Sequence, residues 1–126
     1  MNAAQLNTLA DQLFAAIENG DADALAALWS DDVVVWRQGG GRERDKARGL
    51  KVIEWFVDAT AQRRYEVLDR RIFDGGFVQQ HIVHATANDG RPLQFRACLV
   101  VAVSPAGLIT RIDEYLDPAD LTPLMG

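Results

Sequence analysis

Apolar residues in the first half of the chain recur at helical spacing. Four of them lie three or four residues apart, which is one face of an amphipathic helix: Leu6, Leu9, Leu13 and Ile17. Gly20 predicts the end of this helix, and Asp21 is placed to cap a second, short one. Residues 33–36 read as a first strand, and a third helix is expected up to about residue 62 after a charged segment.

The pattern changes to long strands from residue 63 onward. Four are predicted, with short turns rich in Gly, Asp, Asn and Pro between them: 65–73, 77–87, 93–103 and 108–116. Turns this short indicate antiparallel neighbours, and the tail from Pro118 is expected to form a short helical turn. Early helices followed by antiparallel strands are typical of an α+β fold. Long antiparallel strands coil, so we expect one domain over residues 1–126 with a strongly curved sheet.

Alternation along the last two strands separates a core face from an outer face. Side chains on one side of a strand are two residues apart. In the fourth strand the apolar set is odd-numbered, with Phe95, Ala97 and Leu99 at its centre. In the fifth strand the apolar set is even-numbered and includes Ile112 together with Glu114. A carboxylate is therefore predicted on an apolar face.

The face of the third strand depends on how the hairpin closes. Folding about residues 89–90 places Ile82 opposite Ala97 and His84 opposite Phe95. The next turn places Glu114 opposite Ala97 and Ile112 opposite Leu99. Cross-strand neighbours share a face, so Gln80, Ile82 and His84 are expected on the core side, unless a bulge reverses the alternation. At this register His84 and Glu114 would lie about 12 Å apart, on two sides of one small molecule.

Glu114 is the strongest candidate for chemistry. Burial without a partner raises the pKa of a carboxyl group, which suits a general acid or base. The alternative is a structural ion pair with Arg37 or another cation at the rim. His84 could move a proton or orient a carbonyl group, and Gln80 could donate a hydrogen bond, but each is also typical of an ordinary satisfied side chain.

Aromatic residues are expected to form the wall of the pocket or a simple core. Phe14 and Phe56 are candidates for the wall. Trp36 and Arg37 end the first strand, and one of the two should point inward. Only two histidines are present, with no acidic or cysteine cluster at ligand spacing, so no metal site is predicted.

Composition excludes several classes of partner. The 126 residues carry 13 Lys and Arg against 18 Asp and Glu, a net charge of −5, which argues against nucleic-acid binding. Cys98 is the only cysteine, so no intrachain disulfide can form. The longest apolar run is residues 99–103, far too short to span a membrane. No basic and apolar leader is visible at the start, so we expect a cytoplasmic protein.

Several segments together resemble a known superfamily. The stretches ALAALWSDDVVVW, RGLKVIEWF, FVQQHIVHATANDG and SPAGLITRIDEYLDP look like the nuclear transport factor 2-like superfamily, and within it like SnoaL-like and ketosteroid-isomerase-like proteins. The resemblance implies a cone-shaped fold, with a bent sheet and helices around an apolar pocket, and commonly a homodimer through the outer sheet face. Ketosteroid isomerases carry their Tyr and two Asp residues at positions that here align with Leu13, Leu99 and Arg37, so that mechanism is not implied.

Two functions remain open. The first is a cofactor-free isomerase, cyclase, lyase or hydrolase for a small apolar carbonyl compound, with Glu114 moving the proton. The polyketide cyclases in the resemblance use an Asp on the sheet, which Glu114 or Asp113 could approximate. The second is a binding or dimerisation module without chemistry. A homodimer is expected through Val100, Ile109 and Tyr115 on the outer face.

Overall fold

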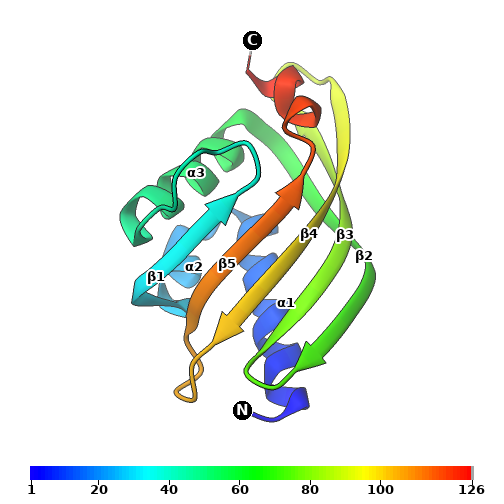
Figure 1. Ribbon diagram of the computed structural model, residues 1–126. Helices are drawn as coiled ribbons and strands as arrows, with labels where there is room; N and C mark the ends of the chain where they lie inside the picture. Colours follow the sequence, from blue (N-terminus) through cyan, green and yellow to red (C-terminus); the bar gives the residue numbers. More distant parts are fainter. Residues whose placement is uncertain (126) are drawn as a thin grey trace.

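The computed structural model describes residues 1–125 and shows helices packed on one curved sheet (Figure 1). Over these residues the chain forms three α-helices, five strands and a final 3-10 helix. In chain order they are α1 (Ala3–Asn19), α2 (Ala22–Leu28), β1 (Trp29–Arg37), α3 (Lys46–Ala59), β2 (Thr60–Phe73), β3 (Gly76–Ala87), β4 (Pro92–Val103), β5 (Ile109–Leu116) and η1 (Pro118–Leu124). The predicted α+β cone is confirmed. None of the described helices is long and apolar enough to cross a membrane.

Helix α1 begins and ends where local chemistry requires it. The Asn2 side chain accepts a hydrogen bond from the Gln5 backbone N–H, and the Gln5 side chain accepts one from the Asn2 backbone N–H, which forms a capping box. The helix stops at Gly20, whose φ of 65° is accessible to glycine at little cost. The stripe predicted from Leu6 to Ile17 faces the sheet and is buried.

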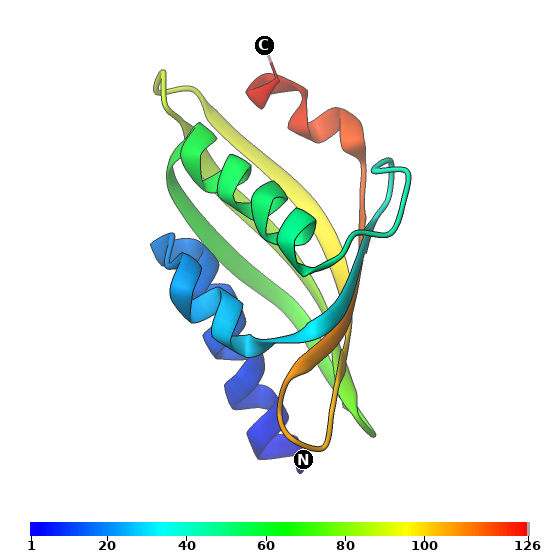
Figure 2. The ribbon, with the colours of Figure 1, turned by 90° about the vertical axis from the view of Figure 1, so that its left-hand side faces the viewer.

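The sheet has the order β1-β5-β4-β3-β2, and only β1 pairs in parallel, with β5. The other neighbours are antiparallel, as the short turns predict. Figure 2 shows α1, α2 and α3 on the same side of the sheet. β2 begins five residues earlier than expected, because Thr60 directly follows the end of α3 and already pairs with Ala87. A long, twisted sheet covered on one face leaves its other face without a partner in the monomer.

The predicted register of β3 is wrong by one residue. His81, not Ile82, pairs with Ala97, and Val83, not His84, pairs with Phe95. A shift of one residue exchanges the two faces of a strand. Gln79 and His81 are therefore fully buried on the core face.

β5 pairs with β4 two residues away from the predicted register, so the predicted face is retained. Glu114 lies opposite Leu99 instead of Ala97, and Ile112 lies opposite Val101. A bulge near the start of β5 interrupts the alternation, and Ile109 is completely buried. The expectation that Ile109 belongs to the outer face is therefore wrong, while Val100 and Tyr115 do lie there, paired with Asp113 and Cys98 on the same face.

Two hydrophobic clusters fill the space between the helices and the sheet. The larger joins α1 and α2 to the middle of the sheet around Trp29, Phe77 and Val101. The smaller lies at the other end around Phe95, Leu116 and Leu121. Phe56 and Tyr65 contact both clusters. The candidate site lies where the two clusters meet.

Candidate active site

A small internal cavity separates the two clusters beneath α3. Its volume is about 90 Å³, and its walls are mostly apolar. Members of its lining come from α1, β1, α3, the centre of the sheet and η1: Leu13, Ile17, Trp29, Val35, Arg37, Arg44, Gly49, Val52, Ile53, Trp55, Phe56, Tyr65, Phe95, Leu99, Ile112, Glu114, Leu116 and Leu121. A mostly apolar wall with a few polar groups is typical of a small-molecule site.

Glu114 is the only carboxylate among the described residues that line this cavity. It projects from β5 between Leu99 of β4 and Arg37 of β1, which are its neighbours in the sheet. Burial raises the pKa of Glu114 above its ordinary value, and the charge of Arg37 opposes this without reversing it. The strand is held in place here because the Gln38 N–H donates to the Glu114 carbonyl at 2.9 Å and the Leu116 N–H donates to Gln38 Oε1 at 3.1 Å.

Trp36 and Arg37 point to opposite sides of the sheet. Arg37 lines the cavity, whereas the Trp36 ring packs on Tyr115 of the outer face, with ring centroids 5.2 Å apart. Of the two candidates, Arg37 is therefore the inward residue, and Trp36 is removed from the site. Arg37 makes no hydrogen bond or ion pair through its side chain within residues 1–125, so its charge is available to a ligand.

Tyr65 is a cavity residue that sequence reasoning missed. It lies near the start of β2, and its ring packs against Phe14 at 5.0 Å and His81 at 4.9 Å. Burial is the largest cause of a pKa of the Tyr65 phenol far above its ordinary value, and the nearby Glu114 carboxylate raises this pKa further. The hydroxyl group therefore stays protonated and can donate a hydrogen bond into the cavity. The predicted strand 65–73 already contained Tyr65, and its pairing with Val83 on the core face of β3 is the signal that places it at the cavity.

Trp29 brings a second donor to the wall. Its side chain is buried, and its indole N–H has no hydrogen-bond partner in the described part of the chain. α3 comes close here because Gly49 lacks a side chain: a Cβ at that position would lie 3.0 Å from Val35 and 3.1 Å from Trp29. A buried donor without a partner costs free energy, and a ligand oxygen could relieve this cost after a small shift.

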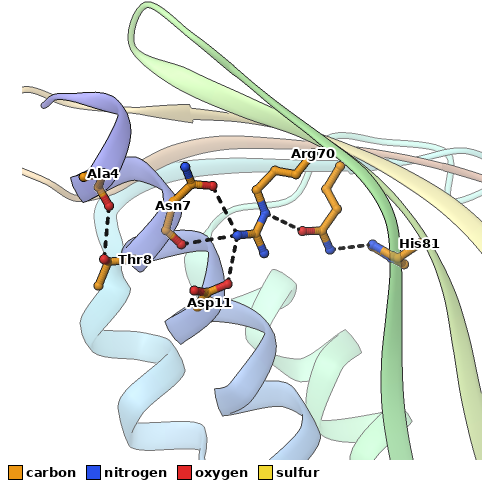
Figure 3. Close-up of polar contacts among 7 residues, drawn as sticks. Ala4, Asn7, Thr8, Asp11, Arg70 and His81 are labelled. Atoms are coloured by element: carbon orange, nitrogen blue, oxygen red, sulfur yellow. Dashed lines mark hydrogen bonds and ion pairs between the residues drawn. The ribbon is translucent and has the colours of Figure 1, made fainter.

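A line of polar side chains runs from α1 to His81 in the core (Figure 3), whose ring packs against Tyr65. Asp11 accepts from Arg70 Nη1 at 2.8 Å, and Arg70 Nε donates to Gln79 Oε1 at 2.8 Å. Gln79 Nε2 then lies 2.9 Å from His81 Nδ1. Gln80, Ile82 and His84 were predicted on the core face in place of Gln79 and His81, so this buried arrangement corrects that prediction and follows from the register of β3.

The chemistry of this line fixes the tautomer of His81. An arginine can only donate, so Gln79 Oε1 accepts and its amide nitrogen donates to His81 Nδ1. The proton of His81 is then on Nε2, which is buried without a partner among residues 1–125. Burial lowers the pKa of His81 to about 4, so the ring is neutral at pH 7. It packs edge-on against Tyr65 and is a structural neighbour of the cavity.

Three predicted site residues lie on the outer face instead of in the cavity. His84 Nε2 lies 2.7 Å from Glu66 Oε1, and Gln80 accepts from Arg96 at 2.8 Å. Ile82 pairs with Arg96 on that same face. The physical reason is the one-residue shift of β3, which turns all three away from Glu114 together.

The remaining predicted lining residues divide into wall and core. Phe56, Phe95, Leu99 and Ile112 line the cavity. Ala97 is buried on the same face without lining the cavity, and Phe14 belongs to the core, where it packs against Tyr65, Phe77 and His81. Phe14 is therefore removed from the candidate site.

Comparisons with solved structures show which folds this arrangement shares. AclR from Streptomyces galilaeus, described as a candidate hydroxylase, superposes with a TM-score of 0.85 at 17% identity over 98% of this chain and 83% of its own. IdmH from Streptomyces antibioticus, a candidate polyketide cyclase, gives 0.81 at 19% identity over 97% and 99%. An LEH-like epoxide hydrolase from M. tuberculosis gives 0.77 at 19% identity over 96% and 89%. At these identities the likeness is one of fold.

Sequence comparison identifies the family. No curated protein matches the chain in sequence. The model of the SnoaL-like domain matches residues 10–112, which include α2, α3, the first four strands and part of β5. With most of the chain matched and the fold shared with SnoaL-like structures, this protein belongs to the family of SnoaL-like domains.

Proposed function

We propose that this protein is a cofactor-independent enzyme that moves a proton on a small, largely apolar carbonyl compound, with Glu114 as general base and acid. The observation that carries the proposal is a single carboxyl group with a raised pKa in an apolar cavity. A carboxyl group is most effective in both roles when its pKa approaches the working pH.

The geometry suggests how one turnover could proceed. The Glu114 carboxylate takes a proton from the carbon next to the carbonyl group, and the electron pair of that C–H bond moves onto the carbonyl oxygen. The Tyr65 hydroxyl and the Arg37 guanidinium, from two residues that line the same cavity, would stabilise the resulting enolate. In a β,γ-unsaturated carbonyl compound, Glu114 then returns the proton to the γ-carbon of the dienolate, which moves the double bond into conjugation with the carbonyl group. Alternatively, the enolate carbon attacks a second carbonyl group of the same molecule, and Glu114 gives the proton to the alkoxide formed as the ring closes.

The names of similar structures support chemistry on small molecules. IdmH is named as a candidate polyketide cyclase and the M. tuberculosis protein as an epoxide hydrolase. Both are below 25% identity, so their activities do not transfer as such. They support a proposal of chemistry on a small organic molecule within this fold.

One observation favours the alternative of a binding module without chemistry. The cavity of about 90 Å³ is smaller than the 300–1,000 Å³ of common ligand pockets. In addition, His84 and Gln80, which were expected to assist Glu114, lie outside. A binding module would hold its ligand with the same cavity wall and the same free Arg37. Glu114 would then only set the polarity of the cavity.

Hydrogen exchange next to a carbonyl group tests the proposal without knowledge of the natural substrate. Cyclohexanone is incubated with the protein in D₂O at pH 7.5, and loss of its α-proton signal is followed by ¹H NMR. We expect exchange above the buffer background and a loss of at least tenfold in Glu114→Gln. The matched control is Asp113→Asn, because Asp113 is the next residue on β5 but pairs with Arg111 on the outer face.

The outcomes separate enzyme from binder. Exchange that depends on Glu114 and not on Asp113 supports the proposal. Saturable binding of cyclohexanone without exchange, or equal exchange in wild type and Glu114→Gln, contradicts it. Circular dichroism of both variants checks that the fold is retained.

We further propose that the outer face of the sheet pairs with a second copy of the chain. The Trp36 and Tyr115 rings pack against each other there, and Val100 and Ile82 are partly exposed on the same face. No helix covers this face within the described residues (Figure 1). Sedimentation equilibrium should give twice the mass of 13.9 kDa. A monomer at all concentrations, or an unchanged dimer in Tyr115→Arg, contradicts pairing through this face.

A further inference from the structure

An open groove continues from the cavity toward the surface. Its volume is about 420 Å³, and it shares Arg37, Val52, Trp55 and Leu121 with the cavity wall. The groove lies between α3, the end of β1 and η1, and Figure 2 shows these segments at one end of the molecule. The shared residues make the groove the natural entrance to the cavity.

The entrance carries two cations and no carboxylate among the described residues that line it. These cations are Arg37 and Lys51, and the rest of the lining is apolar or uncharged. The chain as a whole has a net charge of −5. A positive entrance on an acidic protein concentrates anions at this point.

Five of the eleven other lysines and arginines are engaged with carboxylates in the described residues. Ion pairs hold Lys46, Arg70, Arg71, Arg91 and Arg111. Through residue 125, neither Arg37 nor Lys51 has a hydrogen bond or ion pair through its side chain. Their charges are therefore not used to hold the fold together and are free for a ligand.

The entrance also has a fixed shape. Gly39 packs so closely on η1 that a Cβ at its position would lie 2.3 Å from Pro118 Cγ. Gln38, beside it, binds the backbone of β5 on both sides of Tyr115, through the Glu114 carbonyl and the Leu116 N–H. Arg37 is therefore presented by a strand end whose backbone is tied to both β5 and η1.

We infer that the ligand of this protein is a small monocarboxylic acid, with its carboxylate bound at the entrance by Arg37 and Lys51 and its apolar body in the cavity. An arginine fork matches the two oxygens of a carboxylate, while Trp55 and Leu121 cover the first carbons of the body. This inference rests on the proposed function in one respect, that the cavity is the substrate site. It adds the chemical class of the substrate.

Binding of matched probes tests this inference separately from catalysis. Hexanoate and hexanamide have the same apolar chain, and their affinities are measured by ligand-observed NMR at low and high salt. We expect hexanoate to bind at least tenfold more tightly than hexanamide at low salt. Arg37→Gln should weaken hexanoate at least tenfold and Lys51→Gln about threefold, while hexanamide is little affected. Arg48→Gln, on the same helix as Lys51 but outside the groove, is the control.

Each outcome decides one of the two proposals. Equal affinity for the acid and the amide, or an equal effect of Arg48→Gln and Arg37→Gln, overturns the inference. Tight hexanoate binding that is retained in Glu114→Gln supports the inference of an acid ligand. If cyclohexanone exchange fails at the same time, only the catalytic proposal is lost. Exchange of cyclohexanone without any preference for the acid leaves the catalytic proposal in place and removes this one.

Discussion

Arg37 and Glu114 are direct partners in the register of the parallel strands β1 and β5, and both side chains face the cavity. Neighbouring strands lie about 4.8 Å apart, yet the two side chains form no ion pair in the described structure. Arg37 acts on Glu114 through its charge, which opposes the effect of burial on the carboxyl pKa. The cation can therefore tune the base and still bind a ligand.

Replacement of Arg37 by methionine should raise the pKa of Glu114 further. The cation favours the charged carboxylate, so its removal leaves burial unopposed. The rise of cyclohexanone exchange with pH should move to higher pH in Arg37→Met, because the active base is the carboxylate. Arg48→Met removes an exposed cation of α3 and should leave the profile in place. A shift to lower pH in Arg37→Met would contradict the assigned interaction.

The buried His81 should make the fold less stable in mild acid. Its pKa is lowered from 6.5 to about 4 by burial, so the unfolded chain binds a proton that the folded chain rejects between these values. The free energy of unfolding should fall by up to about 3 kcal/mol as the pH drops through this window. The measurement is urea unfolding at pH 7 and pH 4.5 for wild type and His81→Leu.

His81→Leu should lose the fall in unfolding free energy between pH 7 and pH 4.5 that His81 causes. It should also be less stable than wild type at pH 7, because the Gln79 amide loses its contact with His81. His84→Leu, which changes the partly exposed histidine on the outer face, is the matched control and should keep the wild-type slope. If His81→Leu and wild type lose stability equally between pH 7 and pH 4.5, His81 is not the group responsible.

Gly39 should be much less tolerant of a side chain than Gly41. Both have positive φ, 78° and 82°, so alanine is strained to a similar extent at either position. Only at Gly39 would the new Cβ meet Pro118, at 2.3 Å, whereas nothing lies within 4 Å of it at Gly41. We expect Gly39→Ala to cost about 1–3 kcal/mol more stability than Gly41→Ala, from overpacking.

The same pair of variants reports on the entrance groove. Hydrogen exchange measured by mass spectrometry should show faster exchange of η1 in Gly39→Ala than in Gly41→Ala. Equal stability and equal exchange in the two variants would show that the contact between Gly39 and η1 does not hold the entrance in shape.

The size of the error in each predicted strand register, one residue or two, explains which parts of the site the sequence could predict. In the β4–β5 pairing the prediction was off by two residues, which restores the same face, so Glu114 remained on the core side. In the β3–β4 pairing it was off by one, which exchanged His84 for His81 and Gln80 for Gln79. β3 carries a glutamine and a histidine on each of its two faces. The residue types in β3 therefore could not show which face is turned to the core.

Other parts of the site depend on contacts between distant segments. The parallel pairing of β1 with β5 places Arg37 beside Glu114, and no local pattern encodes it. Tyr65 lies on the cavity side because it pairs with Val83 on the core face of β3, and this face was not predicted correctly from the sequence. By contrast, the α1 stripe and the order of the long strands are local properties, and both were predicted correctly.

A direct titration of Glu114 tests the central claim. Protein labelled with ¹³C at the glutamate Cδ is followed by NMR from pH 3 to pH 9, with Glu114→Gln assigning the resonance. We expect an inflection clearly above the ordinary glutamate value of 4.5, because the effect of burial on the pKa outweighs that of the Arg37 charge. An inflection at or below 4.5 would contradict it, since Glu114 would then be an ordinary solvated or ion-paired carboxylate.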